Sequence, residues 1–107
     1  MTIKTITPKE LQKKLSESSP PFLVDVREPF EREVSNIGGT HIPLGQLGSR
    51  HSEIPKEGDV VIYCRSGGRS GRAVEELQKH FGYQNLINLE GGMLRWIDEV
   101  DGTLRKD

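Results

Sequence analysis

The chain has 107 residues, 33% of them hydrophobic, and a formal net charge of −1. This length fits one domain with a modest core, the near-zero charge argues against nucleic-acid binding, and no apolar run approaches the roughly 20 residues that span a bilayer. We therefore expect a single domain over residues 1–107 that binds neither nucleic acid nor a membrane.

Short apolar runs alternate with helical patterns along the chain, which predicts an α/β domain with a largely parallel sheet. Residues 3–6 form the first short run. Thr7 and Glu10 with Pro8 between them are typical of a capping box that starts a helix. Residues 22–26 form a nearly continuous apolar run, which indicates a central strand covered on both faces.

The middle of the chain leads to a second buried strand. A short helix is expected up to about Val34, and a weak one over residues 44–53. A turn at residues 55–59 precedes a strand over 60–63. The helix that follows is predicted over residues 70–81 because its apolar residues recur at helical spacing.

The last elements are a strand over residues 86–89, a turn at Gly91 and Gly92, and a helix. The inner face of this helix is predicted to carry Met93, Trp96, Ile97 and Val100. The polar tail, residues 101–107, is expected to fray.

Cys64 is the only cysteine, and it stands where the strand over residues 60–63 meets a glycine-rich loop. No internal disulfide can form, and a free thiol suits a reducing compartment, so we expect a cytoplasmic protein. Arg65, Arg69 and the N-terminus of the following helix all favour the thiolate. The loop amides would hold an anion in the same place.

The spacing from cysteine to arginine argues against a phosphatase. Four residues separate Cys64 from Arg69, whereas cysteine phosphatases have five between cysteine and arginine in order to enclose a tetrahedral phosphate. Here the sixth residue after Cys64 is Ser70. The smaller loop fits the terminal sulfur of a persulfide better, so phosphatase and arsenate reductase activities are disfavoured.

Four motifs, in order, resemble the rhodanese-homology domain of the single-domain sulfurtransferase type. They are residues 24–28, 39–43, 61–70 and 89–96. The resemblance implies a five-stranded, mainly parallel sheet with helices on both faces. It also implies an enzyme that moves sulfur from thiosulfate or a persulfide to cyanide, a thiol or a protein.

The residues expected to act follow from the loop and the resemblance together. Cys64 is the predicted catalytic nucleophile, and the predicted substrate- and persulfide-binding residues are Arg65, Ser66, Gly67, Gly68, Arg69 and Ser70. The expected donor is a small anion such as thiosulfate or glutathione persulfide. No cofactor and no metal are expected, because one cysteine and scattered histidines give no ligand cluster.

Two alternatives remain open. One is a non-catalytic rhodanese module that recruits a protein partner. The other is sulfur relay to a ubiquitin-like carrier, because residues 44–47 depart from the commonest pattern and are similar to rhodanese domains fused to sulfurylating adenylyltransferases. Asp25 and Arg27, at another strand end, are interpreted as a structural ion pair rather than as catalytic groups. Met93 and Trp96 are interpreted as core residues.

Overall fold

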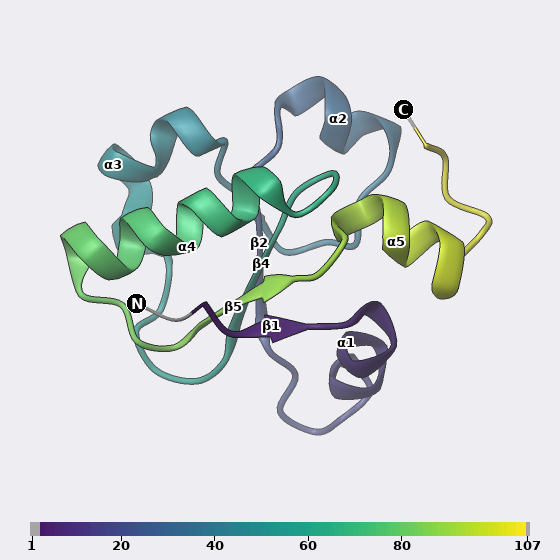
Figure 1. Ribbon diagram of the computed structural model, residues 1–107, viewed down its shortest axis with the longest axis horizontal. Coiled ribbons are helices and arrows are strands. Elements are labelled where there is room, and N and C mark those ends of the chain that lie inside the picture. Colours follow the sequence, from purple (N-terminus) through teal and green to yellow (C-terminus); the bar gives the residue numbers. More distant parts are fainter. Residues whose placement is uncertain (1–2, 107) are drawn as a thin grey trace.

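The structure, a computed structural model that describes residues 3–106, is built on one sheet of five parallel strands (Figure 1). The strands are β1 (Thr5–Ile6), β2 (Phe22–Asp25), β3 (Thr40–His41), β4 (Val60–Tyr63) and β5 (Leu86–Leu89). Their order across the sheet is β1-β5-β4-β2-β3, and every neighbouring pair is parallel. The predicted α/β class and parallel sheet are confirmed, with β4 at the centre.

In the described part of the chain, four helices connect successive strands and a fifth follows β5. They are α1 (Pro8–Leu15), α2 (Pro29–Val34), α3 (Leu47–Arg50), α4 (Gly68–Phe81) and α5 (Gly92–Glu99), and the 3-10 turns η1 (Leu44–Gln46) and η2 (His51–Glu53) flank α3. The predicted capping box is present at the start of α1. None of the helices within the described part of the chain is long and apolar enough to cross a membrane.

Two helix predictions need correction. The helix expected over residues 44–53 is broken into η1, α3 and η2, and Gly45 and Gly48 in this segment weaken a continuous helix. Helix α4 begins at Gly68, two residues before the predicted start. Its first turn therefore lies inside the cysteine loop rather than after it.

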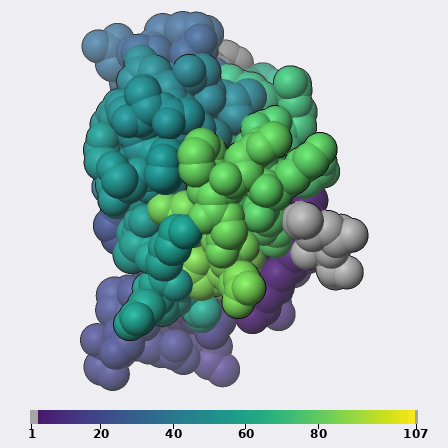
Figure 2. Space-filling view, turned by 90° about the vertical axis from the view of Figure 1, so that its left-hand side faces the viewer, coloured from purple at the N-terminus to yellow at the C-terminus, as the bar shows by residue number. Residues whose placement is uncertain are grey.

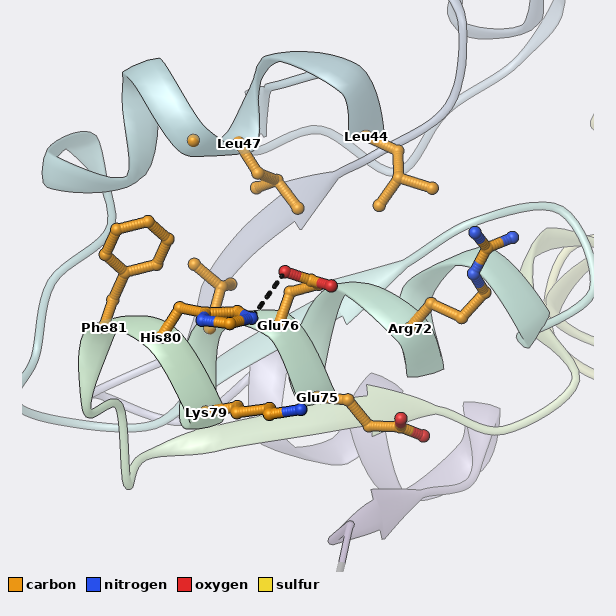
Figure 3. A pocket seen from close by; sticks show the side chains of 10 residues that line it. Leu44, Leu47, Arg72, Glu75, Glu76, Lys79, His80 and Phe81 are labelled. Carbon is orange, nitrogen blue, oxygen red and sulfur yellow. Dashed lines mark ion pairs between the residues drawn. The ribbon is translucent and has the colours of Figure 1, made fainter.

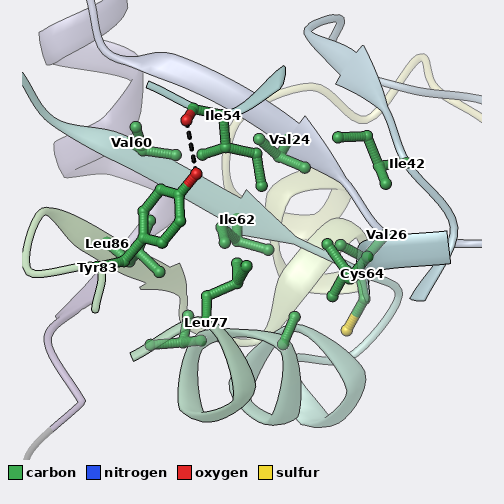
Figure 4. Packing of buried hydrophobic residues seen from close by; sticks show 13 residues of the cluster. Val24, Val26, Ile42, Ile54, Val60, Ile62, Cys64, Leu77, Tyr83 and Leu86 are labelled. Carbon is green, nitrogen blue, oxygen red and sulfur yellow. Dashed lines mark hydrogen bonds between the residues drawn. The ribbon is translucent and has the colours of Figure 1, made fainter. Parts of the chain in front are cut away.

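Side chains of β4 alternate between two cores, one on each face of the sheet. Val60, Ile62 and Cys64 pack in a cluster with residues of α4 (Figure 4). Val61 and Tyr63 pack in a second cluster with residues of α1 and α5. Because both faces are covered, β4 is apolar along its whole length, as a central parallel strand must be.

The carboxyl ends of the parallel strands share one edge of the sheet. There β2 ends at Asp25, β4 leads into Cys64, and β5 leads into Gly91. The loop after β4 lies among α2, α4 and α5 at this edge (Figure 1). In open α/β sheets this edge is where ligands bind, so the fold places the predicted loop in a suitable position.

The C-terminal segment, residues 101–106, makes contacts with the rest of the domain. Ser35 Oγ donates to the carbonyl of Arg105 at 2.8 Å, and Lys106 Nζ lies 2.6 Å from Asp98 Oδ1. Leu104 packs against the core on the α5 side of the sheet. These contacts hold the segment against α2 and α5; Asp107 lies outside the described residues.

Candidate active site

Cys64 follows β4 directly, and its sulfur points towards the first turn of α4 (Figure 4). The side chain is 1% exposed. The backbone N–H groups of Gly67 and Ser70 donate to Sγ at 3.1 and 3.3 Å, and Ser70 Oγ lies 3.3 Å from it. Donors converging on one sulfur stabilise negative charge there. The arrangement therefore suits a thiolate, or an anionic sulfur bound to it.

The N-terminus of α5 holds the backbone of the loop. Met93 N donates to the carbonyl of Cys64 at 2.9 Å, and Leu94 N donates to that of Arg65 at 3.0 Å. The first amides of a helix have no partner within the helix, and here loop carbonyls accept their hydrogen bonds. Gly92 has φ +58°, and an added Cβ would come within 2.5 Å of the Cys64 carbonyl oxygen. Only glycine allows α5 to approach the backbone of Cys64 this closely.

Ser70 and Asn88 connect the loop to β5. Ser70 Oγ lies 2.5 Å from Asn88 Oδ1, and Asn88 Nδ2 donates to the Gly67 carbonyl at 3.2 Å. A hydroxyl has one proton, so at any moment Ser70 can donate it to Asn88, to the sulfur of Cys64, or to the Gly67 carbonyl at 3.2 Å. The reduced thiol can donate to the Ser70 oxygen in the first state, and a thiolate can accept from it in the second.

The other predicted loop residues have different positions. Gly67 has φ +103°, in the left-handed region that favours glycine, and so it forms the turn into α4. Ser66 and Gly68 are exposed, while Arg65 is half-buried. The hydrogen bonds to the sulfur described above come from Gly67 and Ser70. The roles predicted for Cys64 and for all six loop residues in the reaction and in binding substrate remain predictions.

Arg69 forms an ion pair that the sequence analysis did not foresee. Its Nη1 and Nη2 atoms lie 2.6 and 2.7 Å from the two carboxylate oxygens of Glu31 in α2. The side chain of Glu31 is 5% exposed and that of Arg69 is 33% exposed. Hydrogen bonds from Arg69 are the largest cause that lowers the pKa of Glu31; burial raises it, and a backbone hydrogen bond from Glu28 lowers it further. The pKa of Glu31 is lowered to about 2 as a result. Glu31 is therefore ionised at neutral pH.

This lowered pKa predicts a pH-dependent contribution to stability. The folded-state pKa is below the usual value of 4.5, so the contribution is fully present above about pH 4.5 and is lost as the pH falls towards 2. We expect Glu31→Gln to lower the free energy of unfolding by about 2 kcal/mol at pH 6, after allowance for the solvent around Arg69. In urea unfolding, the difference in free energy of unfolding between wild type and Glu31→Gln should be smaller by more than half at about pH 2.5. A gap of the same size at both pH values would contradict the assignment.

Asp25 and Arg27 form the expected structural ion pair. Arg27 Nε lies 2.9 Å from Asp25 Oδ1, and Arg32 Nη1 lies 3.3 Å from Oδ2. The arginines also donate to backbone carbonyls, Arg27 to Ser35 at 2.7 Å and Arg32 to Gly39 at 2.9 Å. Asp25 is fully buried. The network connects the end of β2 to α2 and to the chain before β3, and so it fixes the helix that carries Glu31.

The remaining candidate residues have structural surroundings. His41 Nε2 lies 2.7 Å from the Arg27 carbonyl, and His80 Nε2 lies 3.5 Å from a carboxylate oxygen of Glu76. Within residues 3–106, no three His, Cys, Asp or Glu side chains gather as metal ligands would. Met93 and Trp96, 2% and 7% exposed, belong to the core as predicted.

A groove of about 450 Å³ lies away from the cysteine, between α4 and the segment η1–α3 (Figures 2 and 3). Leu44 and Leu47 form one wall, and Arg72, Glu76 and His80 of α4 lie opposite. Cys64 is not among the lining residues. The groove is therefore separate from the cysteine loop at the end of β4.

Known proteins resemble the chain over most of its length. The family model described as a rhodanese-like domain matches residues 7–99. A sulfurtransferase of Allochromatium vinosum is 39% identical over 95 residues, which cover 88% of each chain. A probable adenylyltransferase/sulfurtransferase of Mycobacterium tuberculosis is 32% identical over 99 residues, 90% of this chain but 25% of that protein. The structure of a rhodanese-like domain protein from Staphylococcus aureus superposes with a TM-score of 0.82 at 33% identity, covering 98% of this chain and 99% of that one.

Proposed function

The chain belongs to the family of rhodanese-like domains, and we propose that it is a sulfurtransferase that carries sulfur as a persulfide on Cys64. Relatives named as sulfurtransferases support sulfur transfer in general. The observation that carries the finer proposal is the set of hydrogen-bond donors from Gly67 and Ser70 around the buried Cys64 sulfur.

The proposed reaction has two displacements. In the first, the Cys64 thiolate attacks the sulfane sulfur of the donor, and the S–S bond of the donor breaks. With thiosulfate the leaving group is sulfite, which takes the bonding electron pair, and Cys64–S–S⁻ remains. In the second, an acceptor attacks the outer sulfur and regenerates the Cys64 thiolate; cyanide as acceptor yields thiocyanate. Electrons and charge balance in both steps, and no proton has to be delivered to the leaving group.

Two features favour sulfur over phosphate as the transferred group. The first is the spacing of four residues between Cys64 and Arg69. The second is the ion pair that holds Arg69 on Glu31, because an arginine that grips phosphate at two points needs its two terminal nitrogens for that purpose. The backbone donors suit the single negative charge of a persulfide.

We further propose a small anionic donor, such as thiosulfate or glutathione persulfide, and an acceptor that includes a protein. Phe30 of α2 is 64% exposed, next to Glu31, and offers an apolar contact near the loop. The similarity to an adenylyltransferase/sulfurtransferase and to a putative sulfur carrier protein of Bacillus subtilis favours a carrier as acceptor. The free thiol fits a reducing compartment, and we propose the cytoplasm.

The test is intact-mass analysis after incubation with thiosulfate, with cyanide added last and thiocyanate measured in the same sample. We expect Cys64 to gain the mass of one sulfur atom and to lose it to cyanide as thiocyanate. Absence of a mass gain with both thiosulfate and glutathione persulfide would reject the enzyme and favour the module that only recruits a partner.

A further inference from the structure

We propose that Glu31 selects the sulfur donor: by compensating the charge of Arg69 it makes the loop favour a thiol persulfide over thiosulfate. This inference rests on the proposed sulfurtransferase function and names its preferred substrate class. It assigns a specificity role to a residue of α2 that lies 38 positions before its partner in the chain.

The geometry fixes the Glu31 carboxylate in place. Both of its oxygens are bonded to Arg69, at 2.6 and 2.7 Å, and one of them also accepts a hydrogen bond from Glu28 N at 3.0 Å. The carboxylate is 5% exposed, so water does not replace these partners easily. The network of Asp25, Arg27 and Arg32 in turn fixes the ends of α2.

The ion pair lowers the net positive charge near an anion bound in the loop. Arg69 follows Gly68 at the start of α4, one residue before Ser70, which donates to the Cys64 sulfur. Its positive charge lies in the first turn of α4 beside this sulfur, and its pKa is raised by Glu31 first and, to a smaller extent, by Cys64. Glu31, ionised at neutral pH, compensates this charge. The donors closest to the sulfur are then an amide of Gly67 and the amide and hydroxyl of Ser70, which are uncharged.

The two donor classes carry different charge into this loop. Thiosulfate is a dianion whose charge lies within one bond of the sulfane sulfur. Its reaction, Cys64–S⁻ plus S–SO₃²⁻ giving Cys64–S–S⁻ plus SO₃²⁻, brings three negative charges together. A protonated persulfide R–S–SH reacts differently: its outer sulfur bonds to Cys64–S⁻, the R–S bond to that sulfur breaks, and the proton of the outer sulfur passes to the leaving R–S⁻. The products are Cys64–S–S⁻ and R–SH, so the reacting sulfurs carry a single negative charge throughout. A loop in which the charge of Arg69 is compensated by Glu31 disfavours the first reaction much more than the second.

The experiment compares rates of sulfur loading on Cys64 by thiosulfate and by glutathione persulfide, read by quenched intact-mass analysis without cyanide. In Glu31→Gln we expect the ratio of the thiosulfate rate constant to the persulfide rate constant to rise about ten-fold, because a full positive charge then faces the dianion. The rise should become smaller as the ionic strength increases.

Two control variants separate charge from other effects. Glu33→Gln changes the net charge by the same amount at an exposed position of α2, and it should leave the ratio at the wild-type value. Glu31→Asp keeps the negative charge while shortening the side chain, and its ratio should stay within about three-fold of wild type, which also covers the case in which Glu31→Gln folds poorly.

An unchanged ratio in Glu31→Gln, with both donors active, would overturn the donor selection and leave the sulfurtransferase intact. An equal shift in Glu33→Gln would overturn it as well, since general charge would then explain the effect. A wild-type protein that neither donor loads would reject the proposed function, and the inference with it.

Discussion

Cys64→Ser is expected to lower sulfur loading and transfer at least about a thousand-fold, to below detection. In the proposed mechanism the sulfur atom forms the S–S bond of the intermediate, and a serine hydroxyl is not ionised under the same conditions. Serine retains the ability to accept hydrogen bonds from the amides of Gly67 and Ser70, which now reach Sγ. The fold should therefore persist, and the loss should be in chemistry. Intact-mass analysis and thiocyanate formation measure it, with thermal unfolding as the check on the fold.

The lone cysteine provides a matched chemical control for this variant. Alkylation of the wild-type protein can occur only at Cys64 and should abolish activity, while the serine variant should take up no label. The result also separates an enzyme from a module that only recruits a partner. An enzyme loses its function in the alkylated protein and in the serine variant, whereas a recruiting module keeps its partner binding in both. Transfer that persists in Cys64→Ser would place the sulfur elsewhere and reject the mechanism.

The sequence predicted the parts of the site that are close together along the chain. Cys64, Gly67 and Ser70 lie within one short loop, and the structure brings their polar atoms together around the sulfur. Their arrangement follows from local rules, because a strand end, a glycine turn and a helix start are each readable from neighbouring residues. The parallel sheet was predictable for the same reason, from short apolar runs alternating with helical patterns.

The distant contacts were not predictable in this way. Glu31 reaches Arg69 only because β2 and β4 are neighbours in the sheet, and nothing in a single sequence links a helix acid to an arginine 38 residues later. Asn88 gave a weak signal, as a polar residue inside an apolar strand, but not its partner Ser70. The segment 44–53 is not the single weak helix that was predicted, because Gly45 and Gly48 weaken a continuous helix there.

Asp25→Asn is expected to destabilise the fold by about 3–5 kcal/mol. The variant leaves the guanidinium of Arg27, 2% exposed, without the carboxylate that accepts from its Nε and Nη2 atoms. A domain of this size has a total stability of about 5–15 kcal/mol, so the change would remove a large share of it. Urea unfolding at neutral pH measures the effect. Asp59→Asn, at an exposed position before β4, is the matched control and should stay within about 0.5 kcal/mol of wild type.

The structural interpretation of Asp25 predicts more than a loss of stability. Adding Arg27→Met to Asp25→Asn removes the buried cation that has lost its carboxylate. The double variant should recover more than half of the lost free energy of unfolding, because the destabilisation comes from an unpaired buried cation rather than from a missing attraction. The folded fraction of Asp25→Asn should still load sulfur on Cys64, since the partners of Asp25 are the two arginines and the amide of Arg27. If stability stayed within about 1 kcal/mol of wild type while loading collapsed, Asp25 would act in the reaction itself, and the ion pair would be part of the active site rather than of its support.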